Sequence, residues 1–108
     1  MWLLAEVDTL MTRTMKLVDS DAAAEDVAVD VAAVLRDWSR PIVIAGQQAT
    51  FEAACGVLAR RLEAERAKLL SCADAWPLDG LSRAAGHAEA LQAAQRAALA
   101  AIDTFVAA

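Results

Sequence analysis

Apolar residues recur every three or four positions along most of the chain, and short breaks divide this pattern into four segments. Such a period marks one face of an α-helix. The first segment, Trp2 to Val18, predicts an amphipathic helix with a broad apolar face. That face consists of Leu3, Leu4, Val7, Leu10, Met11, Thr14, Met15, Leu17 and Val18.

The second segment follows Asp19-Ser20-Asp21, residue types that commonly cap the start of a helix. Ser39-Arg40-Pro41 predicts a break in this helix, because proline has no backbone N–H to donate. Residues 42–45 form the only β-branched run, and the pattern leaves helix, strand and loop open for them. A lone strand would leave its backbone unpaired, so we interpret the run as an apolar connector or the first turn of the next helix. The apolar positions before the break are Val27, Val31, Val34, Leu35 and Trp38.

The third segment, from about Gln47 to Ala75, predicts a long helix that ends at Trp76-Pro77. Leu78-Asp79-Gly80 then predicts a turn, with Asp79 as a candidate cap. The third helix carries a seam with four-three spacing at Phe51, Cys55, Leu58, Leu62, Glu65, Leu69, Cys72 and Trp76.

The fourth segment, Leu81 to Val106, predicts a helix whose apolar face is rich in alanine. Such a thin face requires a close neighbouring helix for stability. The face consists of Ala84, Ala88, Leu91, Gln95, Ala98, Ile102 and Phe105.

Alanine accounts for 28 of the 108 residues and has the highest helix propensity of all residues. Together with the four segments, this composition predicts an all-α fold, an antiparallel helical bundle of about four helices. The length fits one domain that spans residues 1–108.

The formal net charge is −5, which argues against nucleic acid and anionic membrane surfaces as partners. No apolar stretch approaches the roughly 20 residues that span a bilayer, and Glu6 and Asp8 interrupt the apolar start before it resembles a signal peptide. The chain has only two cysteines, which suggests reduced thiols. These observations predict a cytoplasmic protein.

Few side chains are candidates for catalysis or metal binding. Cys55 and Cys72 lie about 25 Å apart on one straight helix, so they cannot form a disulfide bond, and both are interpreted as small buried hydrophobes. His87 is the only histidine, and we interpret it as a surface or hydrogen-bonded side chain rather than a catalytic base. With no paired Cys/His spacing, the sequence predicts no metal site, no cofactor and no enzymatic activity.

Charged residues gather on two helix faces. Asp26, Asp30 and Asp37 share a face of the second helix, which predicts a solvated acidic surface or a contact for a basic partner. A mixed cluster on the third helix predicts a solvated face with ion pairs along the helix. That cluster consists of Arg60, Arg61, Glu63, Glu65, Arg66 and Lys68.

The apolar faces of the four segments together exceed what a small bundle hides, and such a surplus marks contact with another protein. We therefore predict a non-enzymatic protein–protein interaction module that captures a partner through apolar helix faces. A small acidic chaperone or adaptor subunit of a bacterial assembly or secretion machine would fit, as would self-association into a homodimer. Tryptophan is a frequent interface anchor. The candidate partner-binding residues are Trp2, Leu3, Val7, Leu10, Trp38 and Trp76.

Two other functions remain open. One is a small ligand-binding or catalytic bundle that uses Cys55 or His87, with Trp38 and Phe51 beside the thiol. The other rests on Trp38-Ser39-Arg40 at the predicted helix break, which resembles the Trp-x-Gly turn of WXG100-type secreted proteins, with Arg40 in place of the glycine. That resemblance implies a secreted helical partner protein.

Overall fold

Four helices make up the computed structural model, which describes residues 2–72, 77 and 80–105, and the side chains of residues 5–42, 44–72, 77 and 80–104. They are α1 (Trp2–Asp19), α2 (Ala24–Ile44), α3 (Gln48–Ser71) and α4 (Leu81–Phe105). The described residues contain no strand, so the prediction of an all-α bundle with four helices is confirmed.

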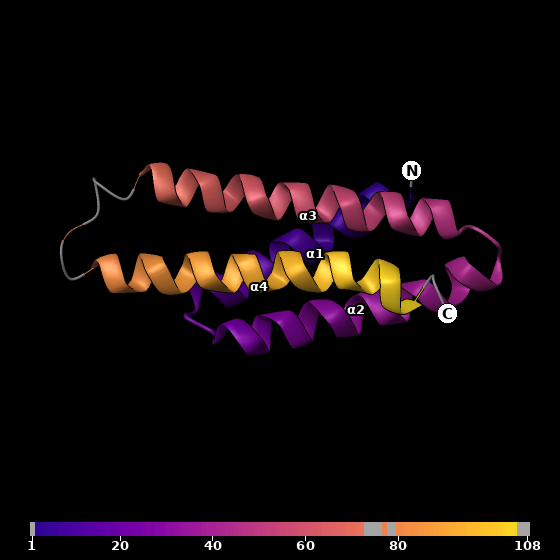
Figure 1. Ribbon diagram of the computed structural model, residues 1–108, viewed down its shortest axis with the longest axis horizontal. Coiled ribbons are helices and arrows are strands. Elements are labelled where there is room, and N and C mark those ends of the chain that lie inside the picture. The colour runs from indigo at the N-terminus through magenta and orange to yellow at the C-terminus, as the bar shows by residue number, and fades with distance from the viewer. Residues whose placement is uncertain (1, 73–76, 78–79, 106–108) are drawn as a thin grey trace.

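Successive helices run in opposite directions along a bundle that measures 50 × 23 × 19 Å (Figure 1). Helix α4 lies between α2 and α3 and packs closely against both, while α1 lies behind α4 in this view. As a result α2 and α4 are parallel neighbours, although neither follows the other directly in the sequence.

Small side chains explain why α4 approaches both neighbours so closely. Alanine brings little bulk between two helix backbones, so the axes can come near one another. The buried apolar residues of α4 are mostly alanines, in agreement with the predicted need for a close neighbour. They are Ala84, Ala88, Ala90, Ala94, Ala98 and Ala101, together with Leu91.

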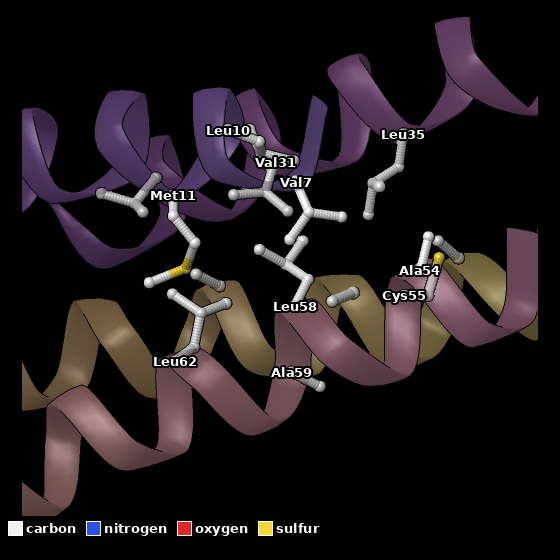
Figure 2. Packing of buried hydrophobic residues seen from close by; sticks show 14 of the residues in the cluster. Val7, Leu10, Met11, Val31, Leu35, Ala54, Cys55, Leu58, Ala59 and Leu62 are labelled. Carbon is white, nitrogen blue, oxygen red and sulfur yellow. The ribbon is translucent and has the colours of Figure 1, made fainter. Parts of the chain in front are cut away.

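Larger side chains fill the space between α1 and the other helices. In Figure 2, Met11 of α1 and Leu62 of α3 point toward one another, and Val7 and Leu58 face each other one turn away. Val31 and Leu35 of α2 complete this layer, and all of these side chains are buried. The core is therefore continuous along the middle of the bundle.

The turn between α1 and α2 differs from the prediction. Asp19-Ser20-Asp21 does not cap α2, which begins at Ala24. These residues instead end α1: the N–H of Asp21 donates to the carbonyl of Val18 (3.0 Å), and the N–H of Ala22 donates to that of Leu17 (3.1 Å). This is the Schellman pattern. Asp21 occupies its left-handed position with a φ of 62°, which aspartate tolerates better than most residues.

The predicted break at Ser39-Arg40-Pro41 is wrong, because α2 continues through Pro41 to Ile44. Burial of Ile42 against the core favours this extension. Proline has no N–H to donate to the carbonyl of Asp37, four residues earlier. Both Asp37 and Pro41 are exposed, so water can bond to that carbonyl instead. Residues 42–44 are therefore helix rather than connector. Helix α2 ends at Ile44. In the turn that follows, Gly46 has a φ of 75°, and the N–H of Gln47 donates to the carbonyl of Ile42 (3.0 Å).

Helix α3 ends at Ser71 rather than at Ala75, and its seam is only partly buried. Phe51, Cys55, Leu58 and Leu62 are buried, whereas Glu65 and Leu69 are half-buried and Cys72 is exposed. The seam opens because the last turns of α3 and the first turns of α4 extend past the turn between α1 and α2 (Figure 1). The predictions for residues 73–76, Leu78, Asp79 and Val106, and for the side chain of Phe105, lie outside what the structure describes.

Candidate binding site at the open end of the bundle

Three elements meet where α3 and α4 extend past the other helices. They are the turn between α1 and α2 (residues 19–25), the end of α3 (residues 65–72) and the start of α4 (residues 81–91). We call this region the open end. Here Asp21 of the α1–α2 turn, Cys72 at the end of α3, and Arg83 and His87 of α4 line one region, although they are far apart in the sequence.

Asp21 connects the α1–α2 turn to α4. Its Oδ1 accepts a hydrogen bond from Arg83 Nε (2.9 Å) and lies 2.7 Å from His87 Nε2. Since a carboxylate can only accept, His87 donates its Nε2–H to it. Arg83 Nη2 also donates to the backbone carbonyl of Asp19 (3.1 Å). We call Asp21, Arg83 and His87 the clasp.

The clasp favours the charged form of Asp21. The hydrogen bond from Arg83, followed by that from His87, lowers the pKa of Asp21 below its ordinary value. His87 is only 9% exposed and has a carboxylate partner, so of the two predicted environments, surface or hydrogen-bonded, it has the second.

A hollow of about 420 Å³ lies between α1, α3 and α4 on one side of the clasp. We call it the apolar hollow, because aliphatic and thioether side chains form much of its lining: Met15, Val18, Leu69 and Leu91. Polar side chains complete it: Asp19, Glu65, Lys68, Cys72, Arg83 and His87. The hollow therefore combines an apolar patch with six polar or charged side chains, and binding pockets combine apolar surface with polar groups that fix a ligand's orientation.

A second hollow, of about 820 Å³, lies on the other side of the clasp between the start of α2 and the start of α4. We call it the acidic hollow, since its carboxylates outnumber its cations. It shares Arg83 and His87 with the apolar hollow, so the two adjoin. Its other lining residues are Asp21, Ala22, Ala23, Ala24, Glu25, Ser82, Gly86 and Glu89.

The two thiols have opposite environments. Cys55 is fully buried, and burial, with a smaller contribution from Glu52, raises the pKa of its thiol to about 12. A thiol with that pKa is not a nucleophile at neutral pH, as expected for a buried packing residue. Cys72 is exposed and lines the apolar hollow, so its predicted burial is wrong. The reason is that α3 has passed the end of α1 at this position.

The predicted acidic face of α2 is partly neutralised. Asp30 accepts two hydrogen bonds from Arg13 of α1, at 2.8 Å from Nε and 2.7 Å from Nη2. The bonds from Arg13 lower the pKa of Asp30. Ion pairs also form in the charge cluster of α3, between Lys68 and Glu65 (3.4 Å) and between Arg61 and Asp8 of α1. Among the described side chains, no three potential ligands gather as a metal site would require.

Of the six predicted partner-binding residues, the structure describes the side chains of Val7, Leu10 and Trp38. Val7 and Leu10 are each only 1% exposed and belong to the core, and Trp38 is half-buried against it. The side chains of Trp2 and Leu3, and Trp76 as a whole, lie outside what the structure describes. Their role in binding stays a prediction.

The sequence reasoning missed the open end. Leu69 and Cys72 were assigned to a buried seam, and no pattern connected Met15, Arg83 and the α1–α2 turn. Five large apolar side chains are exposed among the described residues, and two of them, Leu70 and Leu81, belong to the open end. The other three are Val29, Ile44 and Leu99.

Comparison of the chain with protein-family models, with curated proteins and with solved structures found no match. Within the described part of the chain, no helix has the length and apolar character needed to cross a bilayer.

Proposed function

We propose that this protein is a non-enzymatic protein–protein interaction module that receives a partner's apolar side chain in the apolar hollow. The observation that carries the proposal is the lining of that hollow, where Met15, Leu69 and Leu91 lie beside charged groups. Interfaces concentrate their binding energy in such places, where a large side chain fills an apolar pocket within a polar rim.

The size and surroundings of the hollow suit this role. A volume of about 420 Å³ falls in the lower part of the range for pockets that enclose a ligand group. Leu70 and Leu81 are exposed at the same end of the bundle, outside the lining of the hollow. A partner helix that lies across the hollow would bind in the helix-in-groove mode of recognition.

A small acidic chaperone or adaptor subunit of a bacterial assembly or secretion machine, located in the cytoplasm, would work in this way. The net charge of −5 suits a role in which electrostatic attraction raises the association rate and selects the partner. The chaperone or adaptor role is a narrower proposal than the interaction function, and it holds only if the interaction function does.

A defined helical peptide tests the proposal. An 18-residue amphipathic peptide with leucine on one face and glutamine on the other is titrated into the protein, and methyl NMR shifts are followed. We expect shifts at Met15, Val18, Leu69 and Leu91, and their loss in Leu69→Arg, because the new charge occupies the hollow. Leu99→Arg is the matched control, since Leu99 is an exposed leucine outside the hollow. If no shift reaches the hollow, the proposal is wrong.

A second copy of the chain is an alternative partner, and light scattering behind a sizing column over a dilution series distinguishes it. A dimer that Leu69→Arg dissociates and Leu99→Arg does not would place the second copy at the open end. A monomer at all concentrations would leave a different protein as the partner.

A catalytic or ligand-binding bundle is the second candidate, because Cys72 and His87 line the same hollow and Asp21 orients the histidine. Covalent catalysis requires a thiol and an oriented base within reach of one substrate, and here both groups line one hollow. In this geometry the nucleophile would be Cys72, which lines the hollow, rather than the buried Cys55. Activity lost in both Cys72→Ser and His87→Asn, with the circular dichroism spectrum unchanged, would favour this candidate.

The WXG100-like alternative loses its structural basis. The residues that carry that resemblance, Trp38-Ser39-Arg40, lie inside α2 and not at a turn between helices. We therefore do not propose it.

A further inference from the structure

We infer that the partner presents a cationic amphipathic helix, which places an apolar side chain in the apolar hollow and a lysine or arginine over the acidic hollow. This inference rests on the proposed interaction function and adds the chemistry of the partner. It combines the adjoining positions of the two hollows with the charges that line them.

The charge on the lining of the two hollows is unbalanced. Five carboxylates line the two hollows, and only Lys68 and Arg83 offset them, which leaves a formal charge of −3 with His87 neutral. Over the whole open end Arg66 adds a third cation, so residues 19–25, 65–72 and 81–91 carry a formal charge of −2 with His87 neutral. The carboxylates belong to Asp19, Asp21, Glu25, Glu65 and Glu89.

Three of these carboxylates are available to a partner: Asp19 at the apolar hollow, and Glu25 and Glu89 at the acidic hollow. Asp21 is held by Arg83 and His87, and Glu65 is paired with Lys68. Glu25 and Glu89 are exposed on the acidic hollow, and neither takes part in an ion pair within the described part of the chain. A cation over this hollow would therefore meet two carboxylates without displacing an existing pair.

The geometry suits a helix that crosses the open end. The two hollows adjoin at Arg83 and His87, and the α4 residues that line them span positions 82–91. Ten residues of helix extend about 15 Å, which matches two to three turns of a partner helix. On that helix, side chains three, four or seven positions apart share a face, so one can fill the apolar hollow while another reaches Glu25 and Glu89.

Three 18-residue peptides that share one leucine face and carry lysine, glutamine or glutamate on the other face test the inference. Binding is measured by calorimetry at low and high salt. We expect the lysine peptide to bind about tenfold more tightly than the glutamine peptide at 50 mM salt, and this advantage to fall to about twofold at 500 mM, because salt screens exposed charges. The glutamate peptide should bind most weakly.

A pair of charge-matched double variants locates the effect. Glu25→Gln/Glu89→Gln should weaken binding of the lysine peptide about fivefold, since each exposed charge contributes modestly. Glu52→Gln/Asp103→Asn removes the same charge from exposed residues near the other end of the bundle, and should change binding by less than about twofold. Equal losses in both variants would mean that only net charge matters, and would overturn the inference.

The outcomes separate the inference from the proposed function. If the lysine and glutamine peptides bind the hollow equally well, the cationic partner is wrong while the interaction function stands. If none of the peptides shifts the methyl resonances of Met15, Leu69 and Leu91, both are wrong. Tighter binding of the glutamate peptide would assign an anionic partner instead.

Discussion

Helices α1 and α4 bury apolar faces in the same bundle, but they do so in different ways. Helix α4 buries mainly alanines and packs closely on both α2 and α3. Helix α1 buries the larger side chains of Val7, Leu10 and Met11, and it is also tied by ion pairs from Arg13 to α2 and from Asp8 to α3. Close backbone approach stabilises one helix, and side-chain volume stabilises the other.

Their polar groups differ as well. Thr14 of α1 is completely buried, and its hydroxyl has no hydrogen-bond partner among the described atoms. On α4 the buried polar side chain, His87, is paired with Asp21. The comparison shows that the small residues of α4 set its close packing on α2 and α3. Helix α1, in contrast, places the unpaired hydroxyl of Thr14 in an otherwise apolar interface.

Removal of volume from α1 should have the largest effect. We expect Leu10→Ala to lower the free energy of unfolding by about 3 kcal/mol, because the truncation leaves a cavity that α1 cannot close. Urea unfolding followed by circular dichroism measures the change. Leu99→Ala, at an exposed leucine, should cost less than about 0.5 kcal/mol. Similar losses in both variants would contradict a core supported by side-chain volume on α1.

Addition of volume to α4 should come next. Ala94 is fully buried, so Ala94→Leu forces the close helices apart and should cost about 2 kcal/mol. Ala100→Leu makes the same change at an exposed position and should stay within about 0.5 kcal/mol of the parent protein. If α4 accepts leucine equally well at both positions, its alanines do not set the helix spacing.

Removal of the unpaired hydroxyl should stabilise α1. We expect Thr14→Val to raise the free energy of unfolding by about 1 kcal/mol, since it replaces an unsatisfied buried hydroxyl by a methyl group of similar size. Thr9 is the matched control, because its exposed hydroxyl donates to the carbonyl of Ala5 (3.0 Å). A gain in Thr9→Val as large as that in Thr14→Val would show that the buried hydroxyl is not the cause.

The smallest effect concerns the clasp, which connects the end of α1 to α4. Because the pKa of Asp21 is lowered in the folded protein, its charge stabilises the fold above the ordinary aspartate pKa of about 4, and this stability is lost as the pH falls through the lower, folded value. Asp21→Asn should therefore be less stable than the parent at pH 7, and the difference should shrink below pH 4. Unfolding measured from pH 7 to pH 2.5 tests this, and a difference independent of pH would exclude the ion pair as its source.

Much of the fold could be predicted from the sequence, since helical periodicity reports directly which face of each segment is apolar. The errors fall where tertiary contacts outweigh local preference. Pro41 is a helix breaker by itself, yet burial of Ile42 extends α2 beyond it. Asp21 resembles a helix cap, yet it ends α1 in a left-handed conformation and binds Arg83 and His87 more than 60 positions away.

The candidate site could not be predicted in this way. Leu69 and Cys72 continue the pattern of a buried seam, and only the relative lengths of the helices decide that α1 no longer covers them. A one-dimensional pattern states which face is apolar, but it does not state where the neighbouring helix ends. The open end is therefore a product of helix length and packing.

By itself the sequence determined the helical class, the approximate extent of α1 and α4, the acidic charge and the inert environment of Cys55, because propensity, periodicity and charge are local properties. Only the tertiary structure decided that α4 lies between α2 and α3, that His87 meets Asp21, and that two hollows adjoin at the clasp. These contacts join residues far apart in the chain, and their free energy depends on how whole helices pack.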